Sequence, residues 1–388
     1  MKIVADENIP LVAEAVGPLG EVLTVPADAI SPALVRDAQA LLVRSVTPVG
    51  PDLLDGSAVR FVGTATIGTD HVDRAYLACR GIGFASAEGS NARSVAEYVF
   101  AALSVLAERG GWRLAEKALG IVGVGNIGSR VARLAEGVGV KVLRNDPPIA
   151  RQTGDPEYLP LDALADADIV TFHVPLTREG PDTTYHMINT SLVSRLKRGV
   201  ILLNTSRGSV ADTTALKAAL AAGRLGALAL DVWENEPAID LELLDAADLA
   251  TPHIAGYSYD GKVNGTRMIL EALCRHFGVE RAWDPTPLLP PPAQPRVPIS
   301  RRASVEEAIR VATRAAYDID ADDARLRRIV RETPDRRAVY FKDLRKHYPV
   351  RREFPFTAAC LEGDNPSAAE ALAALGFPVE RQRPKGRP

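Results

Sequence analysis

The stretch "GIVGVGNIGSRVARLAEGVGVKVLRND", residues 120–146, carries the pattern that decides the fold. Gly123, Gly125 and Gly128 are spaced as GxGxxG between an apolar, strand-like run and a helical pattern. Asp146 follows at the end of the next strand-like run. The glycine pattern alone is a weak signal, but this whole context is typical of a dinucleotide-binding turn. The stretch therefore predicts a strand, a helix and a second strand that together bind a dinucleotide.

Each residue of the turn has a physical reason to be there. Gly123 permits the tight turn, Gly125 lets a pyrophosphate approach the backbone, and Gly128 lets the helix and strand pack closely. The backbone amides of Asn126 and Ile127 are expected at the N-terminus of the helix, where the helix dipole favours phosphate groups.

Asp146 bears on the choice of dinucleotide. A carboxylate at the end of the second strand accepts hydrogen bonds from the ribose hydroxyls and repels a 2′-phosphate. We therefore expect NAD as the cofactor rather than NADP. The alternative interpretation is a glycine turn that binds no ligand.

Short apolar runs alternate with helical patterns on both sides of this stretch. Such runs are typical of parallel sheets that are covered on both faces. We predict an α/β protein with two doubly wound parallel-sheet domains, a flavodoxin-like substrate domain and a Rossmann NAD domain, followed by a C-terminal α+β dimerisation domain. The predicted boundaries are residues 1–93 and 257–282 for the substrate-binding domain, 94–256 for the NAD-binding domain, 283–298 for a proline-rich linker and 299–380 for the dimerisation domain.

The composition limits the class of protein. The 388 residues carry a net charge of −3, with 46% hydrophobic and 24% charged residues, which is ordinary for a globular protein. This balance argues against nucleic acid or a membrane as a partner. Three widely spaced cysteines without a CxxC motif indicate a reducing compartment and predict neither a disulfide framework nor a metal site. The N-terminus does not resemble a signal peptide, so we expect a cytoplasmic protein.

Three charged residues follow three consecutive strand candidates. Arg207 follows "VILLNTS", Glu236 follows "LGALALDVW" and His253 ends "LATPHIA". Because ligands of open α/β sheets bind beyond the carboxyl ends of the strands, these side chains are expected beside the dinucleotide. Histidine can take a hydroxyl proton, a carboxylate can orient it, and arginine can hold a substrate carboxylate. The trio predicts oxidation of a hydroxy acid, although each residue alone could be a solvated loop residue.

The motifs "GIVGVGNIG", "HVPLT", "LLNTSRGSVADTTAL", "DVWENEP" and "TPHIAGYS", in this order, resemble the D-isomer-specific 2-hydroxyacid dehydrogenases. The N-terminal motifs and the C-terminal extension narrow the resemblance to members that oxidise a phosphorylated 2-hydroxy acid. The resemblance implies that His253 is the acid/base, Glu236 its paired carboxylate and Arg207 the residue that binds the substrate carboxylate. The alternatives are another member, such as a phosphoglycerate dehydrogenase, and a non-catalytic NAD-sensing protein.

The resemblance also implies further contacts. Ser45, Thr66 and Tyr257 are the expected substrate contacts, and Arg44 is a candidate for binding the phosphate. Hydroxyl groups at strand ends also commonly bond to nearby backbone, which is the alternative for these residues. The remaining residues expected to line the cofactor site are Val174, Pro175, Thr205, Ser206, Asp231 and Gly256.

The segment from about residue 299 onward is rich in aromatic residues and arginine, which are enriched at protein interfaces. We predict that it makes the enzyme a homodimer, as the resemblance also implies. One of its basic residues is a candidate to reach the partner's phosphate site, with Arg345 the first to test and Lys342 and Lys346 next. The alternative is an autonomous surface module with solvated charges. A nucleic-acid role for residues 301–352 is disfavoured, because acidic residues are interspersed among the basic ones. The segment also lacks the aromatic stacking platforms expected of a protein that binds single strands.

Overall fold

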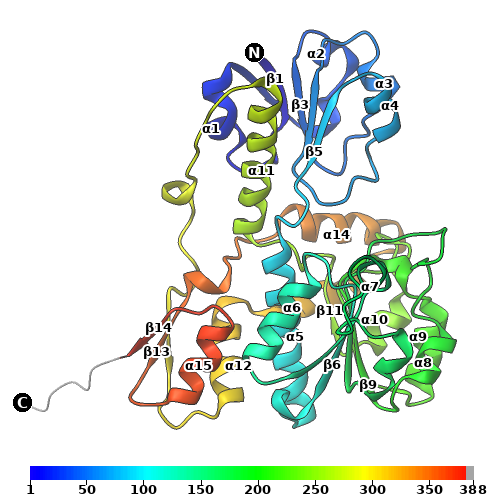
Figure 1. Cartoon of the computed structure of the whole chain (residues 1–388), viewed down its shortest axis with the longest axis vertical. Helices are drawn as coiled ribbons and strands as arrows, with labels where there is room; N and C mark the ends of the chain where they lie inside the picture. The colour runs from blue at the N-terminus through cyan, green and yellow to red at the C-terminus, as the bar shows by residue number, and fades with distance from the viewer. Residues whose placement is uncertain (382–388) are drawn as a thin grey trace, which may run out of the picture. The chain divides into compact units, whose positions relative to one another are not determined.

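The computed structural model describes residues 1–381 (Figure 1). The chain forms two compact units. The first unit comprises Met1–Asn91 and Ser258–Pro290, and the second comprises Ala92–Tyr257 and the segment from Pro291 onward. Among the helices of residues 1–381, none is both long and apolar enough to cross a membrane.

The first unit is built on a five-stranded parallel sheet with the order β2-β1-β3-β4-β5, which is the flavodoxin-like order that we predicted. Its strands are β1 (Lys2–Asp6), β2 (Glu21–Val25), β3 (Ala40–Val43), β4 (Phe61–Thr64) and β5 (Gly83–Ser86). Its helices are α1 (Val12–Val16), α2 (Pro32–Val35), α3 (Pro51–Leu54), α4 (Arg74–Cys79) and α11 (Tyr259–Phe277). Helices α1 and α11 cover one face of the sheet, and α2, α3 and α4 cover the other (Figure 1).

Helix α11 comes late in the chain but belongs to this first core. The Ser258 hydroxyl accepts a hydrogen bond from the backbone amide of Gly261 and starts the helix, and Gly278 ends it in the left-handed conformation with φ 66°. Ile269 and Leu273 are fully buried among side chains of β1, β3 and β4. Helix α11 therefore packs in the core of the first unit, although it follows the six-stranded sheet in the sequence.

The second unit contains a six-stranded parallel sheet with the order β11-β10-β9-β8-β6-β7. Its strands are β6 (Ala118–Val122), β7 (Lys141–Asn145), β8 (Ile169–Phe172), β9 (Val200–Asn204), β10 (Leu225–Leu230) and β11 (Leu249–Ala250). A single bridge from Arg144 to Tyr158 stands where a dinucleotide fold has its third strand. The chain reverses its direction of progress across the sheet between β6 and β8, which is where such sheets bind ligands.

Helices of this part cover both faces of the six-stranded sheet. Helices α5 (Ala92–Gly110) and α6 (Gly128–Gly137) pack on one face, and α8 (Thr190–Arg195), α9 (Thr213–Ala221) and α10 (Leu241–Ala246) pack on the other. Helix α7 (Pro147–Thr153) follows β7 and has no buried residue. Asn189, Asp212 and Asp240 start α8, α9 and α10 by accepting hydrogen bonds from amides of the first turn. The doubly wound α/β class predicted for this part is confirmed.

The C-terminal segment adds a small domain with a three-stranded parallel sheet, ordered β12-β13-β14. Its strands are β12 (Arg296–Ile299), β13 (Ala358–Leu361) and β14 (Val379–Arg381), and its helices are α12 (Val305–Ala316), α13 (Ile319–Arg327), α14 (Pro334–Lys346) and α15 (Pro366–Ala374). The predicted linker, residues 283–298, is therefore wrong at its end, because β12 begins at Arg296. Pro298 is tolerated because β12 is an edge strand.

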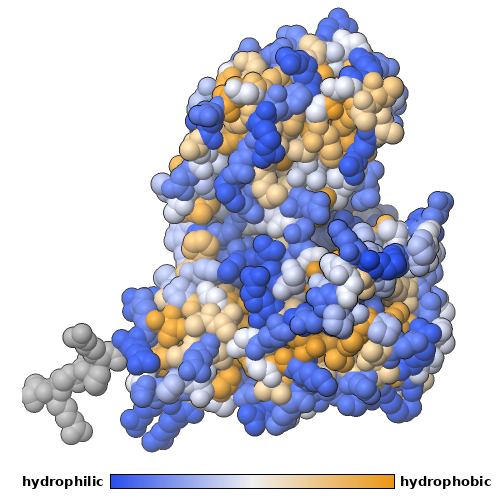
Figure 2. Space-filling view, in the orientation of Figure 1, coloured by the Kyte–Doolittle hydropathy of each residue, from blue (hydrophilic) through white to orange (hydrophobic). Residues whose placement is uncertain are grey.

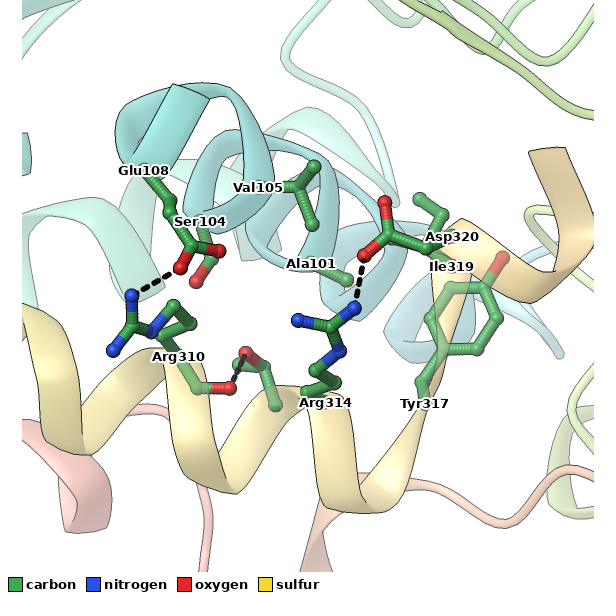
Figure 3. A pocket seen from close by; sticks show the side chains of 10 residues that line it. Ala101, Ser104, Val105, Glu108, Arg310, Arg314, Tyr317, Ile319 and Asp320 are labelled. Carbon is green, nitrogen blue, oxygen red and sulfur yellow. Dashed lines mark hydrogen bonds and ion pairs between the residues drawn. The ribbon is translucent and has the colours of Figure 1, made fainter. Parts of the chain in front are cut away.

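This domain shares its core with the six-stranded sheet. Helix α12 packs on α5, and side chains of both helices belong to one buried cluster that also contains residues of β6 and β13. At the rim of this contact Arg310 pairs with Glu108, and Arg314 pairs with Asp320 at 2.9 Å (Figure 3). The alternative of an autonomous surface module is therefore wrong.

Replacing Phe354 with alanine tests the shared core. Phe354 is 0% exposed and stacks on Phe377 at 4.5 Å. The change should lower the free energy of unfolding by about 3–5 kcal/mol, because it leaves a cavity. Since the core is shared, the thermal transition that NAD stabilises should itself move to lower temperature.

Phe356→Ala is the matched control, because this nearby ring is 38% exposed. It lies under the Arg352 guanidinium at 3.8 Å, so its loss should cost about 1 kcal/mol or less. If Phe354→Ala left the NAD-stabilised transition in place, the two parts of the unit would not share a core.

Candidate active site

The glycine turn joins β6 to α6 and leaves room for a ligand. Gly123 has φ 85°, and a Cβ atom there would lie 2.7 Å from the carbonyl oxygen of His173. A Cβ atom on Gly128 would lie 2.0 Å from the carbonyl oxygen of Gly123. A Cβ atom on Gly125, in contrast, would have no neighbour within 4 Å. Two of the glycines are thus required by the protein's own packing, whereas Gly125 faces open space.

The N-terminus of α6 is available to an anion. Asn126 is exposed, Ile127 is half-buried, and the first turn has no side-chain cap. The helix has 10 residues, so its dipole favours negative charge at this end. A helix N-terminus beside a glycine whose Cβ position is open fits a pyrophosphate.

Asp146 stands at the end of β7, as the sequence predicts. One of its carboxylate oxygens accepts a hydrogen bond from the amide of Val124 at 2.8 Å, and the other accepts one from the amide of Ile149 at 3.1 Å. The residue therefore connects the glycine turn to the start of α7. Each oxygen keeps a lone pair that can accept a ribose hydroxyl.

The loops after β8 and β9 form the other side of the switch point. The amide of Val174 donates to the Ser206 hydroxyl at 3.1 Å, and that hydroxyl donates to the Phe172 carbonyl at 2.7 Å. The Thr205 hydroxyl bonds to the His173 ring at 3.0 Å. Burial lowers the pKa of His173 to about 3, so this ring is neutral and structural. Val174 is half-buried and Pro175 is exposed beside it.

Arg207 follows β9 and is half-buried. Its guanidinium donates one hydrogen bond to the Ser206 carbonyl at 2.9 Å. A Cβ atom on the next residue, Gly208, would lie 1.8 Å from the carbonyl oxygen of Trp233. This close approach holds the backbone beside Arg207 against the loop that follows β10.

The structure brings Glu236 and His253 together. The Nδ1 atom of His253 lies 2.5 Å from Oε1 of Glu236, and both side chains are half-buried. Burial raises the pKa of Glu236, but its bond to His253 and the positive charges of His253 and Arg345 outweigh burial and hold the pKa below its usual value. A carboxylate on Nδ1 fixes the tautomer, so the Nε2 atom carries the lone pair that can accept a proton.

The backbone of His253 is in the left-handed region with φ 57°, which costs a residue other than glycine about 1–3 kcal/mol. Its amide donates to the Asp231 carbonyl at 2.6 Å. The Asp231 carboxylate accepts from the amides of Ile254 and Ala255 at 2.7 and 2.9 Å and from the Thr251 hydroxyl at 2.7 Å. Asp231 therefore holds the strained loop in place.

Asp231 is almost fully buried, and burial raises its pKa, while the charge of His253 and these hydrogen bonds act in the opposite direction. The support extends inward, because the Thr251 hydroxyl uses its hydrogen on Asp231 and must accept from Tyr98 at 2.7 Å. The sequence predicts Asp231 as a cofactor contact, and its role in shaping the loop was not foreseen.

Side chains of the C-terminal domain reach this loop within the second unit. The Arg351 guanidinium donates to the Ala255 carbonyl at 2.6 Å. The ring of Tyr348 meets that of Tyr257 edge to face at 5.8 Å, and the Arg345 guanidinium lies over the Tyr257 ring at 5.5 Å. Gly256, which lies between Ala255 and Tyr257 in the sequence, is half-buried. These contacts were missed, because the arginine-rich and aromatic segment was assigned to a subunit interface.

The predicted substrate contacts of the first unit follow neighbouring strands of its sheet. Arg44 and Ser45 follow β3, and Thr66 follows β4. The Thr66 hydroxyl bonds to that of Thr64 at 2.8 Å and to the Gly68 carbonyl at 3.1 Å. Ser45 is exposed and Arg44 is half-buried. They belong to a different unit from Tyr257 and the charged trio.

The segment "DVWENEP" contains a second glutamate with its own histidine. Oε1 of Glu234 lies 2.6 Å from Nε2 of His186, and Oε2 accepts from the Thr213 amide at 3.1 Å. This pair joins three loops. Within the described residues, no group of three or more His, Cys, Asp or Glu side chains is placed to hold a metal ion.

Two family models match the chain. Residues 89–255 match the D-isomer specific 2-hydroxyacid dehydrogenase, NAD binding domain, and residues 288–376 match a domain of unknown function (DUF3410). The chain is 52% identical over 363 residues to the erythronate-4-phosphate dehydrogenase of Salinibacter ruber. This match covers 91% of this chain and 92% of that protein. The erythronate-4-phosphate dehydrogenase of Marinobacter nauticus is 46% identical, and the match covers 98% of this chain and all of that protein.

A solved structure agrees in fold. The D-lactate dehydrogenase of Aquifex aeolicus, complexed with NAD and lactic acid, is 26% identical with a TM-score of 0.55. The match covers 96% of that chain but 72% of this one. About a quarter of this chain therefore has no counterpart there.

The open space at Gly125 generates a prediction. Gly125→Ala should leave the unfolding temperature nearly unchanged, because the added Cβ atom meets nothing in the protein. It should weaken NAD binding by about tenfold or more, because the Cβ atom occupies the space of the pyrophosphate. Calorimetry measures both quantities.

Gly128→Ala provides the contrast, since it should lower the unfolding temperature by displacing the Gly123 carbonyl. Unchanged NAD affinity in Gly125→Ala would show that the pyrophosphate does not pass this residue.

Proposed function

Because the chain belongs to the D-isomer-specific 2-hydroxyacid dehydrogenase family, and its near full-length relatives are erythronate-4-phosphate dehydrogenases, we propose that it oxidises 4-phospho-D-erythronate with NAD. The product is (R)-3-hydroxy-2-oxo-4-phosphooxybutanoate, and the reaction belongs to the synthesis of pyridoxal 5′-phosphate. The chain is an NAD-dependent oxidoreductase.

The observation that carries the proposal is the bond between His253 and Glu236. The Nε2 atom of His253 takes the proton from the C2 hydroxyl, and Glu236 stabilises the imidazolium that results. NAD, when bound, accepts the hydride from C2. Arg207 holds the substrate carboxylate by a two-pronged contact and polarises the reacting oxygen.

The remaining assignments are part of the same proposal. Ser45, Thr66 and Tyr257 contribute hydroxyl groups to the substrate, and Arg44 is a candidate for binding an anionic group. The cofactor is held by the glycine turn, by Asp146 at the ribose and by the loops after β8, β9 and β10. The residues of those loops are Val174, Pro175, Thr205, Ser206, Asp231 and Gly256.

We also propose that the protein is a cytoplasmic homodimer that uses its C-terminal domain for assembly. Val330, Val339 and Val350 support this, because they are apolar and are 55%, 48% and 53% exposed on that domain. Figure 2 presents one face of the molecule, where apolar residues are scattered among hydrophilic ones.

Light scattering should give twice the mass of the chain. Val339→Asp should reduce the measured mass if the exposed valines of the C-terminal domain form the interface.

A substrate panel tests the function. Purified protein with NAD should reduce the cofactor far faster with 4-phosphoerythronate than with 3-phosphoglycerate or D-lactate, and NADP should be a poor substitute. A preference for 3-phosphoglycerate would identify another member of the family. Binding of NAD without turnover of any of these acids would favour an NAD-sensing protein.

The His253–Glu236 pair generates a prediction on pH. Glu236→Gln removes the negative charge that favours the imidazolium, so the acid limb of the pH dependence of kcat/KM should move to lower pH and the rate should fall. In the unaltered enzyme the Glu236 carboxylate keeps its negative charge until the pH falls to its pKa, which lies below the usual value. An unmoved acid limb would separate Glu236 from the proton transfer.

His253→Asn is the companion variant. It removes the proton acceptor and should reduce kcat by about 10²- to 10⁴-fold while NAD affinity is retained. A loss of less than about threefold, under 1 kcal/mol of barrier, would contradict the assignment.

A further inference from the structure

We propose that Arg345, from the C-terminal domain of the same chain, binds the phosphate of the substrate and so determines the preference for a phosphorylated acid. The inference rests on the proposed function, because it names the residue that recognises one part of that substrate. It differs from the sequence-based expectation, in which Arg345 reaches the phosphate site of a partner subunit.

The position of Arg345 is the first observation. It lies in the last turn of α14, and its guanidinium carbon is 5.5 Å from the centre of the Tyr257 ring. Its positive charge is close enough to Glu236 to help lower the pKa of that carboxyl. Glu236 is bonded to His253. The guanidinium therefore lies over a candidate substrate contact, and its charge acts on the carboxylate that is bonded to the candidate proton acceptor.

The second observation is that Arg345 has unused hydrogen-bonding capacity. Its Nε atom is buried and has no hydrogen-bond partner among residues 1–381. A buried charged donor without a partner costs free energy, so it is expected to find an acceptor in the working enzyme. Its neighbour Arg325 differs, because it is paired with Asp322. Arg351 also has a buried nitrogen without a partner in the described part of the chain, Nη1, but its Nη2 atom already donates to the Ala255 carbonyl.

The surroundings hold Arg345 in place for this purpose. Tyr257, on which it lies, contacts Tyr348, whose hydroxyl donates to the Asp322 carboxylate at 2.7 Å. A planar guanidinium fixed on an aromatic ring presents its edge to a ligand, which suits the oxygens of a phosphate.

The charge of the substrate requires a second cation. 4-Phosphoerythronate carries a carboxylate at one end and a phosphate at the other, and Arg207 is assigned to the carboxylate. The lactic acid bound to the D-lactate dehydrogenase of Aquifex aeolicus has no phosphate. The match to that enzyme covers 96% of its chain but only 72% of this one. The domain that carries Arg345 has the size of the part that has no counterpart in that enzyme.

The test compares a phosphorylated with an unphosphorylated substrate. Arg345→Met keeps an unbranched stem over Tyr257 and removes the charge. The ratio of kcat/KM for 4-phosphoerythronate to that for erythronate should fall by about 10- to 150-fold, the value of hydrogen bonds to a charged group. The inhibition constant of inorganic phosphate should rise in parallel. Arg345→Lys should recover part of the ratio.

Arg336→Met is the matched control, because it removes the same charge from an exposed position of the same helix, α14. It should leave the ratio within about twofold, since exposed charges contribute little. Calorimetry with NAD verifies that each variant is folded and binds its cofactor.

The outcomes separate the inference from the proposed function. If the unaltered enzyme does not prefer 4-phosphoerythronate, the proposed function fails. If it has that preference and Arg345→Met retains it, the inference alone is overturned. Equal losses with both substrates would also overturn it, because Arg345 would then act through Glu236 or Tyr257. If the preference is lost in Arg44→Met but not in Arg345→Met, the phosphate belongs to Arg44.

Discussion

The hydrogen bonds around the Asp231 carboxylate are the constraint on which the candidate site depends. One buried carboxylate accepts from two consecutive backbone amides and from the Thr251 hydroxyl, while its own carbonyl accepts from the amide of His253. These bonds offset the strain of a histidine in the left-handed conformation. They direct the histidine ring toward Glu236, which lies in a different loop. Without them, the loop would relax toward an ordinary backbone conformation and the pair would separate.

The parts of the fold that were predictable depend on local and periodic signals. Apolar runs between helices predict parallel strands, and the glycine turn predicts the first strand and helix of the dinucleotide fold. The charged trio was found because strand ends in such sheets share one edge. The geometry at Asp231 could not be found in this way, because nothing in "DVWENEP" or "TPHIAGYS" reveals a left-handed histidine. Strain of this kind is set by tertiary hydrogen bonds.

The C-terminal segment shows why composition alone does not place individual residues. Arginine and aromatic residues are enriched at protein interfaces. The same residue types also occur where arginine side chains are buried against aromatic rings inside one chain. Phe341 and Phe354 are buried within the second unit, and Arg351 is buried beside Tyr317, with its guanidinium 4.2 Å from the ring. A proline-rich stretch likewise suggests a linker, although its last residues form an edge strand where a missing amide does no harm.

The division of the chain has a consequence for its synthesis. The first unit receives α11 only after the whole six-stranded sheet has been translated, and the second unit receives its last strands from the final residues of the described chain. The apolar faces of β4 and α5 therefore stay uncovered while most of the protein is being made. Neither unit can complete its core before its late segment has been translated, so apolar surface stays exposed during synthesis, which is the condition that favours aggregation of incompletely folded chains.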